Sequence, residues 1–382
     1  MTLSYGSVCS GIEAASLAWE PLGMRPAWFS QFDPEHNYSR SLDFPSRVLA
    51  HHWPHISNVG DMTNIVGLLQ LGAIAAPDIL VGGTPCQAFS LAGLRGGLSD
   101  SRGQLTLEYV RILNELDKLR TVPAIGVWEN VPGVLSSKDN AFGYFLAGLA
   151  GESKPLEPTG RKWSNAGYVS GPTRTVAWRV LDAQYFGVAQ RRRRVFVVAS
   201  ARAGFCPAKV LFEFDGVRRD IAPSRETGSP VAALTANGVG TCGADDNQAQ
   251  AGYLICMAHG QGGAEIKSDD STPTLTCNHE APIAAYGFQP RIARNGRGDM
   301  GDVCHTLSAQ AGETGKCDSA SCVVANTGVR RLTPVECERL QGFPDNHTNI
   351  PGAADGPRYK ALGNSMAVPV MKFIGERILW TL

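Results

Sequence analysis

The apolar positions of the chain fall into short runs separated by stretches with helical spacing. Apolar runs typical of buried strands lie at residues 3–9, 27–31, 78–82, 124–128 and 195–199. Helical spacing begins at Ala14 and recurs over residues 48–53, 105–119 and 368–379. Strands that alternate with helices in this way predict an α/β fold with a doubly wound, mostly parallel sheet.

This pattern changes in the second half of the chain. From residue 207 to residue 329 glycine is frequent and helical spacing fades. Three similar short pieces recur within this stretch, at residues 233–236, 274–277 and 306–309. We interpret the stretch as an inserted, smaller β-rich domain that carries an exposed basic loop near residues 289–299.

Helical spacing returns after this insertion. The sequence Thr333-Pro334-Val335-Glu336 combines an N-cap, a proline at the first helical position and a capping glutamate. We therefore predict one α/β domain built from residues 1–206 and 330–382, with the module of residues 207–329 inserted between its two parts.

Composition narrows the class of protein. The chain has 382 residues, of which 43% are hydrophobic, and 35 basic residues balance 35 acidic ones. This balance excludes a polycation but permits a local basic cleft. No charged-then-apolar leader or long apolar span is present, so we expect an intracellular, cytoplasmic protein that binds no membrane. The ten cysteines are interpreted as reduced thiols, and because they include no C-x₂-C pair we expect no metal.

Cys86 is the first candidate catalytic residue. It follows the apolar run of residues 78–82, and in open α/β sheets the carboxyl ends of strands are where catalytic groups collect. Glu129 ends the next apolar run, so partial desolvation is expected to raise its pKa and to favour the proton-donating form. Taken alone, Cys86 would more often be structural, and Glu129 would be an exposed loop carboxylate.

A run of arginines precedes the strand predicted at residues 195–199. In an extended chain Arg192 and Arg194 lie on one face and Arg191 and Arg193 on the other. One pair can face a cleft, where it binds phosphate or a carbonyl oxygen and lowers the pKa of the Cys86 thiol. The alternative is a solvated charge run, which the flanking apolar residues disfavour.

Two glycine-containing turns are candidates for cofactor binding. Gly11 follows the first strand, where a residue without a side chain lets a ligand approach the backbone. Gly60-Asp61-Met62 forms a second polar turn that can contact an adenine edge. The chain lacks a complete Gly-x-Gly-x-x-Gly sequence, so ordinary turns are the alternative.

Together these segments resemble the DNA (cytosine-5)-methyltransferases. The similar motifs occur in the order usual for that family, and they are Pro85-Cys86-Gln87, Glu129-Asn130-Val131, Gln190-x-Arg192-x-Arg194, residues 331–337 with 340–344, and Gly363-Asn364-Ser365. The resemblance covers the chain outside residues 207–329. It implies the Rossmann-like fold of the S-adenosylmethionine-dependent methyltransferases and makes the inserted module a target-recognition domain.

The resemblance also implies a reaction. S-adenosylmethionine would donate a methyl group to C5 of a cytosine flipped out of double-stranded DNA. By analogy Cys86 adds to cytosine C6, Glu129 bonds or protonates the N3 side, and Asn130 holds Glu129 and the active-site loop. The resemblance also places Arg192, Arg194 and Gln190 around the cytosine or its phosphate. It places Gln87 and Ser90 on a loop that closes on the DNA.

For the cofactor, the resemblance assigns residues from five segments. Ser10, Gly11 and Ile12 line the methionine end, Gln31 and Phe32 contact ribose and adenine, Asp61 and Met62 contact the adenine edge and face, and Pro85, Asn364 and Ser365 complete the site. Two departures stand out. Glu13 and Ala14 replace further glycines of the family, and Gln31 replaces a glutamate, a role that Asp33 takes if the register shifts. Residues 35–43 are extra sequence.

We expect a monomer in a bacterial or phage-infected cell, with any cognate restriction endonuclease acting separately. Two alternatives remain: an RNA cytosine-5 methyltransferase and a non-catalytic DNA-binding regulator on the same scaffold. The long module at residues 207–329 favours DNA, because reading the major groove needs a surface beyond the catalytic fold. The set of Cys86, Glu129 and Arg194 argues against a regulator.

Overall fold

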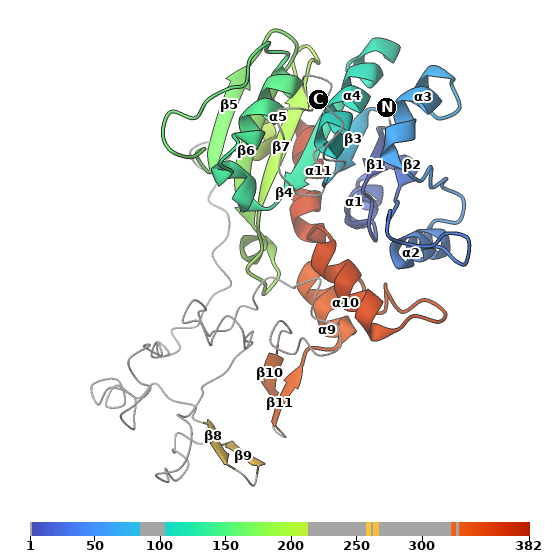
Figure 1. Ribbon diagram of the computed structural model, residues 1–382, viewed down its shortest axis with the longest axis vertical. Coiled ribbons are helices and arrows are strands. Elements are labelled where there is room, and N and C mark those ends of the chain that lie inside the picture. The colour runs from blue at the N-terminus through green and yellow to red at the C-terminus, as the bar shows by residue number, and fades with distance from the viewer. Residues whose placement is uncertain (1, 85–103, 213–256, 261–262, 267–321, 326–327) are drawn as a thin grey trace.

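The computed structural model describes residues 2–84, 104–212, 257–260, 263–266, 322–325 and 328–382 (Figure 1). Its centre is a seven-stranded sheet with the strand order β2-β1-β3-β4-β7-β6-β5. The strands are β1 (Ser4–Val8), β2 (Arg25–Ser30), β3 (Ile79–Gly82), β4 (Ile125–Asn130), β5 (Ala166–Ser170), β6 (Thr175–Asp182) and β7 (Arg193–Ser200).

The sheet is mixed. The pairs β1–β2, β1–β3 and β3–β4 are parallel, whereas β4–β7, β6–β7 and β5–β6 are antiparallel. The predicted doubly wound α/β fold is confirmed, and the five predicted strands correspond to β1, β2, β3, β4 and β7. Strands β5 and β6 were not predicted. In β5 exposed positions alternate with half-buried ones, which leaves little apolar signal.

Helices cover both faces of the sheet (Figure 1). They are α1 (Ala14–Trp19), α3 (Ile65–Gln70), α4 (Gln104–Leu119), α5 (Ala141–Ala150), α6 (Pro207–Leu211) and α11 (Val368–Thr381). Helices α2 (Phe44–His52), α9 (Pro334–Gln341) and α10 (Asp355–Asn364) belong to smaller apolar clusters, and α10 packs on both α2 and α9. Strand β3 carries apolar side chains on both faces of the sheet, so helices must bury both faces. Leu80 packs in the cluster with α3, α4 and α5, whereas Ile79 and Val81 pack in the cluster with α1, α6 and α11.

The end of the chain packs against its beginning. Helix α11 packs on α1, where Trp19 Nε1 donates a hydrogen bond of 2.7 Å to Met371 O. The predicted helix start at Thr333 is confirmed as a capping box with Glu336 at the first turn of α9. The predicted helices at residues 48–53, 105–119 and 368–379 correspond to α2, α4 and α11, each within a few residues.

Little of the inserted module lies within the described residues. The hairpins β8 (Met257–Gly260) with β9 (Gly263–Ile266) and β10 (Cys322–Ala325) with β11 (Gly328–Arg331) agree with a β-rich module. The three similar pieces and the predicted basic loop lie outside the described residues. Helix α6, at the start of the predicted module, packs on β6, β7 and α11, and the division at residue 206 stays a prediction.

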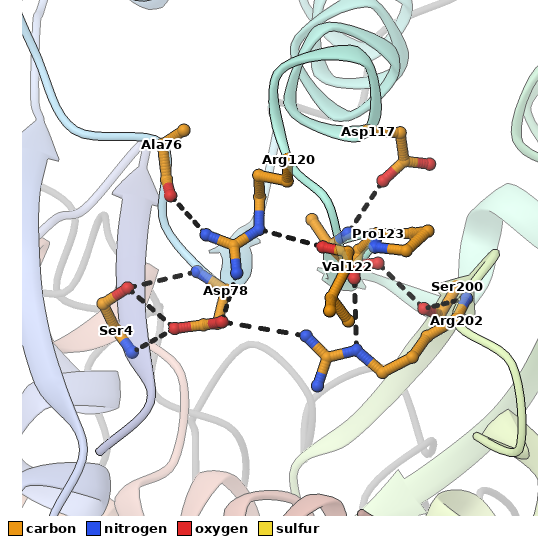
Figure 2. A network of polar contacts seen from close by, with 10 residues as sticks. Ser4, Ala76, Asp78, Asp117, Arg120, Val122, Pro123, Ser200 and Arg202 are labelled. Carbon is orange, nitrogen blue, oxygen red and sulfur yellow. Dashed lines mark hydrogen bonds and ion pairs between the residues drawn. The ribbon is translucent and has the colours of Figure 1, made fainter. Parts of the chain in front are cut away.

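A polar network fixes the edge of the sheet where β1, β3 and β4 begin (Figure 2). Asp78 accepts hydrogen bonds from the backbone and hydroxyl of Ser4 at 2.9 and 3.0 Å, and it also pairs with Arg120 and Arg202. Arg120 Nε donates to Val122 O and Arg202 Nε to Pro123 O. This network ties the loops that precede three strands to one carboxylate.

No helix among the described residues is long and apolar enough to cross a membrane.

Candidate active site

The opposite edge of the sheet, where β4 ends and β7 begins, brings Glu129 and Arg194 together. Because β7 is antiparallel to β4, Glu129 pairs with Phe196 and Asn130 with Val195. The residues that begin β7 therefore meet the residues that end β4. Arg194 Nε lies 3.0 Å from Glu129 Oε1, and both side chains are largely buried. Topology thus assembles an acid and a cation that are far apart in the sequence.

The environment of Glu129 favours the protonated carboxyl group. Desolvation by burial raises its pKa above the usual range, while the charges of Arg194 and Arg192 partly offset that rise. This agrees with the direction predicted from the sequence. At a given pH such a carboxyl group is protonated more often than an exposed glutamate, which suits a proton donor.

Asn130 holds Thr84, the last described residue before Cys86. Its Nδ2 donates a 2.9 Å hydrogen bond to Thr84 O. The Thr84 hydroxyl bonds the Thr106 hydroxyl at 2.7 Å and accepts from Trp128 Nε1 at 3.0 Å. The chain is therefore anchored immediately before Pro85. The predicted residues Pro85, Cys86, Gln87 and Ser90 themselves lie outside the described residues.

Within the arginine run the side chains of Arg192 and Arg194 are largely buried, which settles what strand alternation alone left open. Arg192 is 2% exposed, whereas Arg193 is exposed. Arg192 Nη2 donates to the carbonyl oxygens of Gly363 and Ser365 at 3.1 and 2.5 Å. This bond places Arg192 on the backbone of the last predicted motif and joins β7 to the end of α10. Burial and the neighbouring Arg194 lower its pKa to about 9.

Several polar atoms beside this pair have no hydrogen-bond partner among the residues that the structure describes. Gln190 is fully buried, and neither its amide oxygen nor its amide nitrogen is hydrogen-bonded within the described part of the chain. The Nε and Nη1 atoms of Arg192 are also unpaired there. Buried polar groups are normally bonded, because leaving one unsatisfied costs about 1–3 kcal/mol. Such a cluster is typical of a site that binds a ligand.

A pocket lies at this edge of the sheet, and it collects four of the predicted cofactor residues: Ser10, Gly11, Asn364 and Ser365. Glu129 also lines it, so the candidate acid faces the same space. Two glycines line the pocket without a side chain that would fill it. Gly11 adopts a positive φ of 58°, and a Cβ atom at Gly83 would lie 3.0 Å from Glu129 Oε2.

Pro85 lies outside the described residues, and the other predicted cofactor residues do not line this pocket. Ile12 is fully buried in an apolar cluster with Leu332 and Phe343. Met62 belongs to the core, where its sulfur lies 3.8 Å from Cys9 Sγ. Asp61 caps the turn that starts with Met62, and its carboxylate accepts from Thr63 N at 2.9 Å.

Gln31 and Phe32 have partners of their own. Gln31 Oε1 accepts from Gly11 N at 2.9 Å, and its Nε2 donates to Asp43 at 2.8 Å. Phe32 is half exposed and stacks on Tyr38 with ring centroids 5.1 Å apart. Residues 35–43, which the sequence left unplaced, therefore form a loop that contacts both predicted residues.

Sequence reasoning gave no role to Glu13, which lines the pocket and is 1% exposed. Its carboxylate accepts hydrogen bonds from the Ser7 hydroxyl and from the backbone and hydroxyl of Ser16. The only sequence signal was that a charged residue stands where the resemblance calls for glycine.

A mixed sheet covered by helices on both faces, with a pocket at the carboxyl ends of its parallel strands, is the architecture of a Rossmann-like methyltransferase. The chain matches the family model of C-5 cytosine-specific DNA methylases over residues 3–380. It belongs to this family, and the resemblance inferred from the motifs is confirmed.

Two curated relatives illustrate the range of similarity. The chain is 45% identical to a protein of Escherichia phage P1 named DNA N-6-adenine-methyltransferase, over 98% of this chain and 61% of that protein. It therefore spans about three fifths of that relative. It is 25% identical to the type II methyltransferase M.DsaV of Dactylococcopsis salina, over 99% of this chain and 86% of that protein.

Among solved structures, the Dnmt2 methyltransferase of S. pombe matches with a TM-score of 0.56 and 16% identity, covering 99% of this chain and 97% of that one. At this level of identity the match shows that the two proteins share a fold.

The residues of the pocket suit S-adenosylmethionine. Gly11 and Gly83 leave backbone accessible, Ser10, Asn364 and Ser365 offer polar atoms, and Glu13 offers a buried carboxylate that can face a cation. Within the described residues no group of histidine, cysteine and acidic side chains is arranged to hold a metal ion.

Proposed function

We propose that this protein is a DNA (cytosine-5)-methyltransferase that uses S-adenosylmethionine as its methyl donor and double-stranded DNA as its substrate. The observation that carries the proposal is the buried pair of Glu129 and Arg194 at the carboxyl edge of the sheet. Glu129 of this pair lines the same pocket as the predicted cofactor residues Ser10, Gly11, Asn364 and Ser365. Family membership supports the same chemistry. We propose that the protein acts as a monomer.

In the proposed mechanism the nucleophile is Cys86. An aromatic C5 carbon does not attack a methyl sulfonium unaided, and addition of the thiolate to C6 moves a pair of ring electrons to C5. Glu129 hydrogen-bonds or protonates N3 and so stabilises that charge. After C5 has taken the methyl group, loss of the C5 proton and departure of the Cys86 thiolate restore the ring.

The neighbouring residues would position these groups. Arg194 holds the carboxyl of Glu129 and can contact the flipped cytosine, while Arg192 fixes the end of α10 to β7. Asn130 anchors Thr84 and hence the start of the Cys86 loop. The amide of Gln190, which is unpaired among the described residues, would form a hydrogen bond when the substrate is bound. Flipping the base costs a few kcal/mol, which contacts within the site must offset.

A second candidate is methylation of adenine N6, because the relative from phage P1 carries that name. About two fifths of that relative lies outside the match, so the named activity can reside in a part that this chain lacks. Adenine N6 is itself a nucleophile and needs no thiol addition. Under this alternative Cys86 is dispensable, which separates the two proposals.

The experiment is incubation of the protein with DNA and labelled S-adenosylmethionine, followed by nucleoside analysis by mass spectrometry. We expect label in 5-methylcytosine and none after substitution Cys86→Ser, with DNA binding retained. Label in N6-methyladenine alone, unaffected by Cys86→Ser, would overturn the proposal. The same assay with RNA tests that substrate, and bisulfite sequencing of the methylated DNA identifies the target sequence.

A further inference from the structure

Glu13 is a buried carboxylate for which the described part of the chain provides no basic partner. Its hydrogen bonds come from Ser7 and Ser16 only, at 3.1 Å from Ser16 N and 2.6 Å from Ser16 Oγ. A buried carboxylate is costly unless a cation or several donors compensate it. Burial therefore raises the pKa of Glu13 to about 7.

The backbone at Glu13 is also strained. Its φ is 60°, a left-handed conformation that costs a residue with a side chain about 1–2 kcal/mol and suits glycine. The sequence thus keeps a charged side chain at a position where glycine is easier to accommodate and where burial opposes charge. A structural N-cap does not require this, because serine, threonine or aspartate in an extended conformation caps helices well.

The position of Glu13 suggests what the carboxylate serves. It lines the pocket together with Ser10, Gly11 and Ser365, and Ser7, which donates to it, lines the same pocket. The methyl donor carries a sulfonium cation, and its demethylated product carries a neutral thioether at the same sulfur. A carboxylate at the wall of a desolvated pocket interacts strongly with such a charge.

We infer that Glu13 is a binding residue that distinguishes the two forms of the cofactor, its carboxylate stabilising the sulfonium form relative to the thioether product. This inference rests on the proposed function, since it concerns the same pocket. It assigns to this chain a means of retaining the methyl donor and releasing the product after transfer, in addition to the glycine-lined backbone contacts.

The inference carries a pH dependence. Below about pH 7 Glu13 is protonated in the empty pocket, so binding of the sulfonium form must release that proton. Among the described residues, the ionisable groups that act on Glu13 are Tyr5 on β1 and Glu20 after α1, while Cys9 and Glu129 line the same pocket. Glu129 also has a raised pKa, so the wild-type profile must be compared with that of a Glu13 variant.

The test is isothermal titration calorimetry of the full chain with S-adenosylmethionine and, separately, with S-adenosylhomocysteine. Glu13→Gln keeps the size of the side chain, and Glu13→Gly suits the positive φ. Glu152→Gln removes a charge at an exposed position and is the matched control. Thermal melts of each variant establish that it is folded.

We expect both Glu13 variants to weaken binding of the sulfonium form by about tenfold at pH 8, and to leave binding of the thioether almost unchanged. Wild-type affinity for the sulfonium form should fall by about tenfold from pH 8 to pH 6, and this fall should vanish in the variants.

Two failures are distinguishable. If wild type binds neither compound, the proposed cofactor is wrong. If wild type binds both and the Glu13 variants lose affinity for both equally, or for neither, the cofactor proposal stands and the role inferred for Glu13 is wrong.

Discussion

At the edge where β1, β3 and β4 begin, Asp78, Arg120 and Arg202 all have protein partners (Figure 2). At the edge where the same strands end, Gln190 and Arg192 keep buried polar atoms that are unpaired within the described residues. Both edges bury charge. At the first edge the described residues satisfy one another's polar groups, and at the second edge some buried polar atoms stay unpaired among them.

This difference separates stability from function. A buried network whose members are all bonded holds elements in place, as Asp78 does for the loops before three strands. A network with unpaired buried members lowers the stability of the fold. Such unpaired groups in a folded protein favour a site that binds a ligand. The account predicts that substitutions at the first edge change unfolding and spare turnover, and that substitutions at the second edge do the reverse.

The largest effect is expected for Glu129→Gln. The substitution keeps a hydrogen-bonding group beside Arg194 but removes the acid, so turnover should fall by about 10²–10⁴-fold. The melting temperature should change little, because burial already opposes the charge of Glu129. Methyl transfer to a cytosine-containing duplex, measured alongside thermal melts, checks both. Turnover within a few-fold of wild type would remove Glu129 from the mechanism.

Acidification should lower the free energy of unfolding through His347. The ring nitrogen of this residue is hydrogen-bonded to the carbonyl of Ile12, beside the pocket. Burial lowers the pKa of His347 to about 4. Below about pH 6.5 the unfolded chain binds a proton that the folded chain excludes, so the free energy of unfolding falls by up to about 3 kcal/mol as the pH approaches 4.

Denaturant unfolding from pH 7 to pH 4 measures this effect, with His347→Gln as the variant and the exposed His55→Gln as control. Glu13 and Glu129 oppose the trend, because their raised pKa values stabilise the folded state on acidification. The difference between wild type and His347→Gln at each pH therefore isolates the histidine. A difference independent of pH would contradict its assigned role.

At the first edge, Asp78→Asn should cost about 2 kcal/mol of unfolding free energy, less than a fully buried pair because Asp78 is partly exposed. The loss follows from leaving Arg120 and Arg202 without their shared carboxylate. Turnover per folded molecule should stay at the wild-type value. A loss of turnover without a loss of stability would break the division between the two edges.

The smallest effect on stability is expected for Gln190→Leu. Removing a buried amide without partners should leave the unfolding free energy unchanged or raise it by about 1 kcal/mol. The rate of methyl transfer should nevertheless fall, because leucine cannot form the hydrogen bond that the amide is proposed to make with the bound substrate. Denaturant unfolding and turnover are measured together, and a destabilised variant would show that Gln190 already has a structural partner.

Much of the site follows from local sequence rules. Strand alternation placed Arg192 and Arg194 on one face, the resemblance selected that pair for the site, and the apolar run before Glu129 predicted the direction of its pKa shift. These rules depend on neighbours along the chain. The contact of Glu129 with Arg194 further requires β7 to run antiparallel to β4, and this direction was not predicted because strands β5 and β6 were missed.

The cofactor side was harder to predict for physical reasons. Ile12 and Met62 gain more from apolar contacts in the core than from facing a pocket. The amide of Gln31 is taken by Asp43, a partner from a loop that no periodicity indicated. Glu13 was visible in the sequence only as a departure from glycine, and its role depends on burial that a sequence does not display.

The most direct test of the central claim is a covalent trap at the second edge of the sheet. DNA that contains 5-fluorocytosine in the target sequence is incubated with the protein and S-adenosylmethionine, and the products are resolved by denaturing electrophoresis and peptide mass spectrometry. The fluorine cannot leave as the C5 proton does, so we predict a stable adduct on Cys86 that Cys86→Ser abolishes. Active methylation of the same DNA without any adduct would contradict the account.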